Sequence, residues 1–134
     1  MPRALEELAP RIADVARERG LDLAIVFGSQ ATGKTHARSD FDIAVRHVGR
    51  ALSFSEIAEL TTALAAMIGA DVDVVDVRRA DPLLLRTIFE APRVLHAEAG
   101  ALFEARLHAF HRYEDYRPFL RLERESVRRA LRRP

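Results

Sequence analysis

The sequence predicts an α/β domain: a small mixed sheet flanked by helices, with a helical tail at the C-terminus. Short apolar segments at residues 21–27, 40–45 and 71–77 have the residue types and spacing of strands. Segments with apolar residues every three or four positions lie before, between and after them, as in amphipathic helices. We therefore expect one domain, with a core over residues 1–98 and a helical extension over residues 99–134.

The composition is that of a soluble globular protein and excludes several classes of site. Hydrophobic residues make up 49% of the chain and charged residues 31%, as in a packed domain. The absence of cysteine excludes disulfides, thiolate metal sites and cysteine nucleophiles. No apolar run reaches the ~20 residues that a membrane helix needs, and the N-terminus lacks a secretory signal pattern. We therefore expect a cytoplasmic protein that does not associate with a membrane.

The net charge of +1 is unevenly distributed along the chain. Residues 117–134 contain seven arginines and two glutamates, a net charge of +5, so residues 1–116 carry −4. A basic tail on a mildly acidic body indicates a partner for the tail. The simpler alternative is a helix face that contacts only solvent.

The first part of the chain reads as a helix followed by two strands. Apolar residues at helical spacing run through residues 5–15, where Pro10 predicts a kink or a helix start. Gly20 is a natural end for that helix. Residues 21–27, LDLAIVF, are expected to form a buried strand. Residues 40–45 alternate between polar and apolar, which predicts a strand with one buried and one polar face.

The middle of the chain predicts a second helix and a third strand. Residues 53–56, SFSE, match a capping box, in which a serine side chain and a glutamate side chain satisfy the first backbone N–H groups of a helix. Gly69 is expected to end this helix. Residues 71–77, DVDVVDV, form the third predicted strand.

The last part of the chain is mainly helical. Asp81 and Pro82 predict the start of a short helix, and residues 93–96 predict a minor fourth strand. Helical spacing resumes at Ala99. Pro118 is expected to break or restart the helix, which predicts two final helices.

Two incompatible motifs overlap at Gly28. Residues 28–35, GSQATGKT, fit the phosphate-binding P-loop pattern in every position and follow a predicted strand. A P-loop, however, needs a helix that begins at its lysine, here Lys34, because the first backbone N–H groups of that helix hold the phosphates. The strand predicted at residues 40–45 leaves no room for such a helix. A P-loop nucleotide-binding protein is therefore a remote alternative.

The second motif consists of Gly28 and Ser29, ten further residues, and then the carboxylates Asp40 and Asp42. Alternate side chains on a strand point the same way, with Cα atoms about 6.6 Å apart. Two carboxylates so placed repel each other without a metal and suit a hard cation such as Mg²⁺. Glycine allows close approach of the backbone to a ligand, and the serine adds a hydroxyl group. The alternative is that both aspartates lie on the solvent face of an edge strand.

A third carboxylate is available on the strand at residues 71–77. Asp73 lies in the middle of that strand and is our preferred candidate. Asp71 is on the same face and competes with it, but lies where the strand starts. Asp76 points to the opposite face and is expected at the surface. Two metal ions about 3.5–4 Å apart, held by shared carboxylates, can activate an attacking hydroxyl and stabilise a leaving phosphate.

The segment VFGSQATGKTHARSDFDIAV resembles the signature of the minimal nucleotidyltransferases of the polymerase-β-like superfamily, and DVDVVDV resembles their third acidic strand. The resemblance implies a nucleotidyltransferase fold with magnesium, as two ions, and with ATP as substrate. Gly28 and Ser29 would hold the nucleotide phosphates. Asp73 would complete the metal site and assist deprotonation of the attacking hydroxyl. The implied catalytic and metal-binding residues are Asp40, Asp42 and Asp73.

The helical tail is similar to that of antitoxins in HEPN–MNT toxin–antitoxin pairs. This resemblance implies a type VII-like antitoxin that transfers AMP from ATP to a tyrosine of a HEPN ribonuclease, in a hetero-oligomeric complex and without direct nucleic-acid binding. The alternatives are a non-catalytic, steric antitoxin and a small-molecule nucleotidyltransferase. Arg106, His111 and Tyr113 match the partner's own R-x4-H-x-Y motif, which we interpret as a coincidence.

Overall fold

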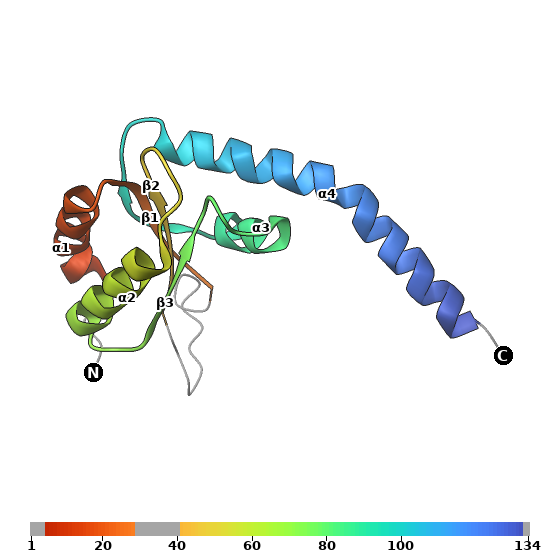
Figure 1. The fold of residues 1–134 in the computed structure, drawn as a ribbon, viewed down its shortest axis with the longest axis horizontal. Helices are drawn as coiled ribbons and strands as arrows, with labels where there is room; N and C mark the ends of the chain where they lie inside the picture. Colours follow the sequence, from red (N-terminus) through yellow and green to blue (C-terminus); the bar gives the residue numbers. More distant parts are fainter. Residues whose placement is uncertain (1–4, 29–40, 133–134) are drawn as a thin grey trace.

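The computed structural model describes residues 5–28 and 41–132. It has the predicted α/β architecture, with helices on both sides of one sheet (Figure 1). In chain order the elements are α1 (Leu5–Glu18), β1 (Leu21–Phe27), β2 (Phe41–His47), α2 (Phe54–Ile68), β3 (Val72–Asp76), α3 (Pro82–Glu90), β4 (Arg93–Ala97) and α4 (Ala101–Arg132).

The four strands form a mixed sheet in the order β3-β2-β1-β4. β1 pairs antiparallel with β2 and with β4, whereas β2 and β3 run parallel. All seven residues of β1 are buried, as its continuous apolar run predicts. The minor strand predicted at residues 93–96 is present as the edge strand β4. β2 is an interior strand, so Asp42 does not lie on an edge strand.

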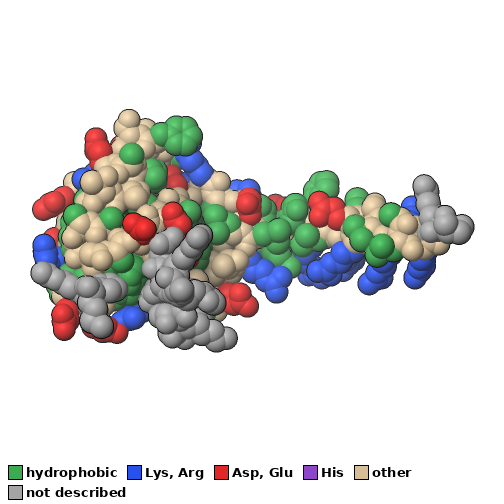
Figure 2. Space-filling model, turned by 90° about the horizontal axis from the view of Figure 1, so that it is seen from below, with side chains coloured by type: hydrophobic (Ala, Val, Ile, Leu, Met, Phe, Trp, Pro, Cys, Tyr) green, Lys and Arg blue, Asp and Glu red, His purple; other side chains and the backbone are tan. Residues whose placement is uncertain are grey.

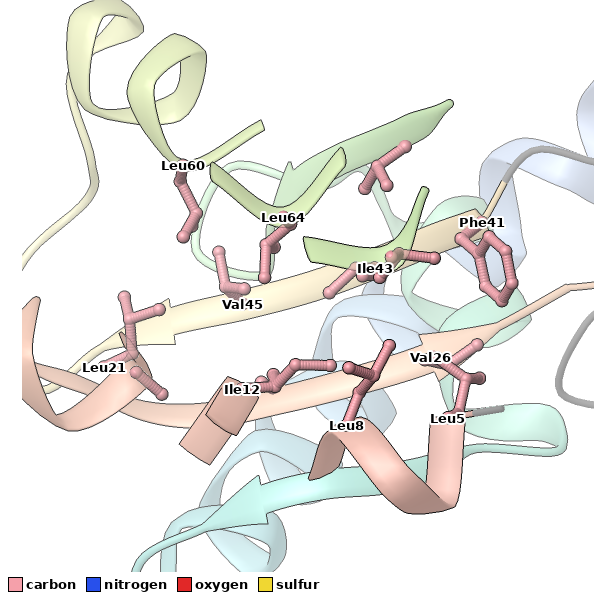
Figure 3. Packing of buried hydrophobic residues seen from close by; sticks show 14 of the residues in the cluster. Leu5, Leu8, Ile12, Leu21, Val26, Phe41, Ile43, Val45, Leu60 and Leu64 are labelled. Atoms are coloured by element: carbon pink, nitrogen blue, oxygen red, sulfur yellow. The ribbon is translucent and has the colours of Figure 1, made fainter. Parts of the chain in front are cut away.

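The sheet separates two hydrophobic cores. On one face, α1 and α2 pack against alternate residues of β1 and β2, including Val26, Ile43 and Val45 (Figure 3). On the other face, α3 and α4 cover the remaining residues of the same strands, including Ala44. Ala44 is 0% exposed, so the prediction that only one face of β2 is buried was wrong. α3 and α4 cover that face, which residue alternation within one strand does not reveal.

Local end signals are confirmed in the second helix and the third. Ser53 accepts the backbone N–H of Glu56, and the Glu56 side chain accepts the backbone N–H of Ser53. Gly69 ends α2 with a left-handed φ of 79°. Asp81 caps α3 by accepting the N–H of Leu84, with proline in the first turn. These signals are correct because each involves atoms only a few residues apart.

α4 differs from prediction because it is one helix of 32 residues with Pro118 inside it. Proline removes one backbone donor and kinks a helix, and α4 bends partway along its length (Figure 1). Good helix formers on both sides, mostly leucine, arginine and glutamate, allow the helix to continue. No helix in the described residues is long and apolar enough to cross a membrane. The division into residues 1–98 and 99–134 stays a prediction.

Candidate active site

Two neighbouring strands, β2 and β3, place acidic residues at one end of the sheet, beside the end of β1. The last residue of β1, Phe27, pairs with Asp42 near the start of β2. Asp42 pairs in turn with Asp73 near the start of β3. Since β2 and β3 are parallel and in register, these two side chains lie on the same face of neighbouring strands, which are roughly 4.8 Å apart. Asp42 is half-buried and Asp73 is exposed. The structure thus brings together two of the three predicted carboxylates.

The other predicted site residues, Ser29 and Asp40, lie outside the described residues, as does Lys34. The start of β2 at Phe41 still bears on the P-loop alternative. A helix beginning at Lys34 would have fewer than two turns before this strand. The competing carboxylate Asp71 is exposed, and its backbone carbonyl accepts the N–H of Phe41 at 3.0 Å.

Gly28 is shaped to accommodate Asp42. Its φ is +77°, a left-handed conformation that glycine adopts without strain. A Cβ atom at this position would lie 2.8 Å from Oδ2 of Asp42, closer than van der Waals contact. Glycine at position 28 therefore leaves room for the Asp42 carboxylate.

We expect Gly28→Ala to impair nucleotide binding and transfer more than it impairs folding. The added methyl group must displace the Asp42 carboxylate, and the positive φ adds roughly 1–2 kcal/mol of backbone strain. The measurement is titration with a fluorescent ATP analogue beside a thermal melt. The matched control is Gly100→Ala, which has the same strain at φ +80° but no atom within 4 Å of the new Cβ. Equal nucleotide affinity in both variants would contradict this role of Gly28.

The carboxylate pair fits a hard divalent cation. Carboxylate oxygens are ligands that Mg²⁺ prefers, and this ion commonly takes one or two of them together with water and substrate phosphates. Within residues 5–28 and 41–132, no group of three or more histidine, cysteine, aspartate or glutamate side chains is arranged to hold a metal. Asp42 and Asp73 would therefore supply only part of a metal site there, to which Asp40 is the predicted addition.

Asp76 was wrongly expected at the surface. It is only 6% exposed, and its carboxylate accepts the backbone N–H groups of Leu52 and Arg78 at 2.8 and 2.9 Å. It therefore joins the segments that follow β2 and β3. Its burial depends on these distant backbone donors, so the repeated Asp-Val pattern could not distinguish it from a surface residue.

A buried ion pair lies on the β1–β2 ladder and was not predicted. Arg46 donates to both carboxylate oxygens of Asp22 at 3.0 and 2.8 Å, and to Glu104 of α4 at 2.8 Å. The hydrogen bonds that Arg46 donates to Asp22, and the one it donates to Glu104, raise the pKa of Arg46, although burial lowers it. The sequence signal that could have predicted this pair is the presence of Asp22 and Arg46 inside two largely apolar strands. The network attaches α4 to the sheet on the face that carries Asp42.

Comparison with known proteins agrees with this geometry. Residues 11–99 match the family model described as polymerase beta, nucleotidyltransferase. A protein adenylyltransferase, MntA of Shewanella oneidensis, is 40% identical over 70 residues, which are 51% of this chain and 48% of MntA. The match thus spans about half the length of that curated relative.

Solved structures show the same fold. A chain from a toxin–antitoxin crystal structure with AMP-PNP has a TM-score of 0.74 and 26% identity, over 92% of this chain and 97% of that chain. A structure described as a minimal nucleotidyltransferase has a TM-score of 0.55 and 28% identity, over 68% of this chain and 95% of that chain. With the family model matching well over half of its residues, this chain belongs to the polymerase beta nucleotidyltransferase family.

Proposed function

We propose that this chain is the antitoxin of a HEPN–MNT pair and that it transfers AMP from ATP to a tyrosine of the HEPN ribonuclease. The observation that carries the proposal is the placement of Asp42 beside Asp73, next to the glycine that ends β1. The similarity to a protein adenylyltransferase and to a toxin–antitoxin complex with a bound ATP analogue supports it. The protein would act in the cytoplasm as part of a hetero-oligomer.

Each predicted site residue has a role in this proposal. Gly28 and Ser29 hold the nucleotide phosphates, the glycine through its backbone N–H group and the serine through its hydroxyl group. Asp40, Asp42 and Asp73 hold magnesium, as two ions. When bound, magnesium supplies positive charge that offsets the charge developing on the phosphate oxygens.

The chemistry is an in-line displacement at the α-phosphorus of ATP. The tyrosine oxygen of the partner forms a bond to that phosphorus, and the bond from the phosphorus to the oxygen that bridges to the β-phosphate breaks. AMP stays on the tyrosine and pyrophosphate leaves. Asp73 accepts the phenolic proton, for which its exposed position on β3 is suited because both the partner and solvent can reach it. Holding the reactants in line supplies much of the rate.

The proposal is tested with ATP labelled in either the α- or the γ-phosphate, magnesium, and the HEPN-family protein encoded by the adjacent gene. We expect covalent label on the HEPN protein from α-labelled ATP only, and its loss when the target tyrosine is changed to phenylalanine. Label transferred from γ-labelled ATP would indicate a kinase instead. Formation of a stable complex with no label from either nucleotide would favour the steric antitoxin and overturn the proposed activity.

A further inference from the structure

α4 is much longer than the domain that it covers. Its first turns pack against the core through the small buried residues Ala101, Ala105 and Ala109. Beyond α3 the helix continues away from the body as a projecting arm (Figures 1 and 2). Apart from the partly buried Leu120, every described residue from Arg117 onward is exposed. Packing onto the domain therefore does not explain the sequence of this arm.

An apolar row runs along the arm and continues the side of α4 that faces the domain. At 100° per residue, its members lie on the same side of the helix as Ala105 and Ala109. Val127 is 57% exposed and Leu131 is 81% exposed, so the row ends in uncovered hydrophobic surface. Exposed apolar surface of this kind marks interaction sites. We call this row the inner face: Tyr113, Tyr116, Leu120, Val127 and Leu131.

A row of arginines runs beside the inner face. Its members recur at intervals of four, three, four and four residues, which keeps them on one side of the helix. Figure 2 shows basic side chains aligned along one side of the arm. Within the described part of the chain, Arg117 pairs with Glu114 at 3.3 Å, whereas the others form no ion pair. We call this row the arginine stripe: Arg117, Arg121, Arg124, Arg128 and Arg132.

At its base, the inner face opens into a hollow between α3 and α4. This hollow has a volume of about 380 Å³. The Arg86 guanidinium lies 4.9 Å from the centre of the Tyr113 ring and donates to its hydroxyl at 2.7 Å. Arg106 lies 5.9 Å from the centre of the Phe89 ring. Tyrosine and arginine are the residue types that dominate binding energy at interfaces, especially in pockets of this kind. In this chain Tyr113 thus belongs to a surface hollow.

We propose that the inner face and the arginine stripe together form the docking surface for the HEPN partner, which presents an apolar helical surface with an acidic rim. This inference rests on the proposed function and locates its partner on the chain. An apolar row beside the arginines favours a protein over RNA, which contacts phosphates mainly through charge. The partner would then lie on the side of the domain that α3 and α4 cover, which is the face of the sheet that carries Asp42.

The fraction of this chain that each solved structure matches agrees with a HEPN protein as the partner. α4 accounts for 32 of the 134 residues. The match to a chain of the toxin–antitoxin complex spans 92% of this chain, too much to omit α4. The match to the minimal nucleotidyltransferase spans 68%, which leaves room for all of α4 to be unmatched. The chain that was crystallised with a toxin therefore matches at least part of α4.

The test compares neighbouring residues on different sides of the arm. Leu120→Glu and Val127→Glu place a charge on the inner face, and Leu122→Glu places the same charge on another side, where Leu122 is already 60% exposed. Arg128→Glu reverses a charge of the stripe, and Arg129→Glu is its matched control. We expect Leu120→Glu, Val127→Glu and Arg128→Glu each to lower the affinity for the HEPN protein roughly tenfold or more. The Leu122 and Arg129 variants should stay within about threefold of the wild type, as for residues outside an interface.

Two further measurements separate this inference from the proposed activity. All arm variants should bind an ATP analogue as the wild type does. The arm is far from Asp42 and Asp73 in the sequence, and the altered side chains do not contact either residue. Asp42→Asn should lose transfer but still bind the HEPN protein. If the wild type binds the partner through the inner face yet transfers no AMP, the docking surface stands and the proposed activity fails.

Three results would overturn the docking surface. The first is equal binding of the HEPN protein by the Leu120 and Leu122 variants. The second is a concentration-dependent dimer of this chain alone that Leu120→Glu dissolves, which would assign the inner face to a second copy. The third is binding of single-stranded RNA that Arg128→Glu weakens and Leu120→Glu does not. Circular dichroism melts of the arm variants should match the wild type, since the altered side chains are exposed or, for Leu120, only partly buried.

Discussion

Asp42→Asn should leave the fold intact and lower AMP transfer by at least ~10²–10³-fold, the usual effect of removing a group that stabilises charge in a transition state. Asparagine has nearly the same shape as aspartate, so the half-buried position on β2 tolerates it. It lacks the negative charge that would hold a divalent cation beside Asp73. The measurement is the rate of label transfer from α-labelled ATP, with a thermal melt to verify folding.

Asp73 on β3 and Asp71, just before that strand, supply the controls for this prediction. Asp73→Asn should reduce transfer about as much as Asp42→Asn, because the two residues are direct partners in the parallel ladder. Asp71→Asn should retain most activity, since that residue lies before the first residue of β3. A loss confined to the Asp71 variant would identify it as the third acid. Wild-type transfer by Asp42→Asn would show that the carboxylate pair is not the active site.

Asp22→Ala should lower the free energy of unfolding by about 3–5 kcal/mol, the usual cost of leaving one member of a buried ion pair without its partner. Arg46 and Asp22 have side chains that are 9% and 7% exposed, and they form a bidentate pair. Without the carboxylate, the guanidinium would keep its charge in a site largely closed to water. The measurement is the urea midpoint of unfolding. For a domain whose total stability is of the order of 5–15 kcal/mol, this shift is large.

Glu104 provides the matched control for the buried pair. It accepts a hydrogen bond from the same nitrogen of Arg46 at 2.8 Å, but its side chain is 68% exposed. Glu104→Ala should therefore cost only about 0–1 kcal/mol, as for an ion pair open to water. Replacing both buried partners, as Asp22→Ala with Arg46→Met, should recover stability relative to Asp22→Ala alone. Equal losses from Asp22→Ala and Glu104→Ala would show that burial does not determine the strength of this network.

The sequence by itself determined the local elements and the candidate chemistry. The bounds of β1, the capping box at Ser53 and the end of α2 at Gly69 were predicted correctly because each depends on the conformational preferences of a few adjacent residues. The aspartates at positions 40, 42 and 73 were selected from spacing within single strands, and their role in a site stays a prediction. A period of two residues assigns side chains to a face of a strand, but it does not say what covers that face.

Only the tertiary structure decided how these elements meet. Parallel pairing of β2 with β3 places Asp73 beside Asp42, and no local pattern specifies which strands are neighbours. Burial of Ala44 follows from α3 and α4 covering that face of the sheet, and burial of Asp76 from distant backbone donors. The continuation of α4 through Pro118 left the arm without a packing partner among residues 5–28 and 41–132. These features arise from contacts between residues that are far apart in the sequence. A local sequence pattern carries no information about the energies of such contacts.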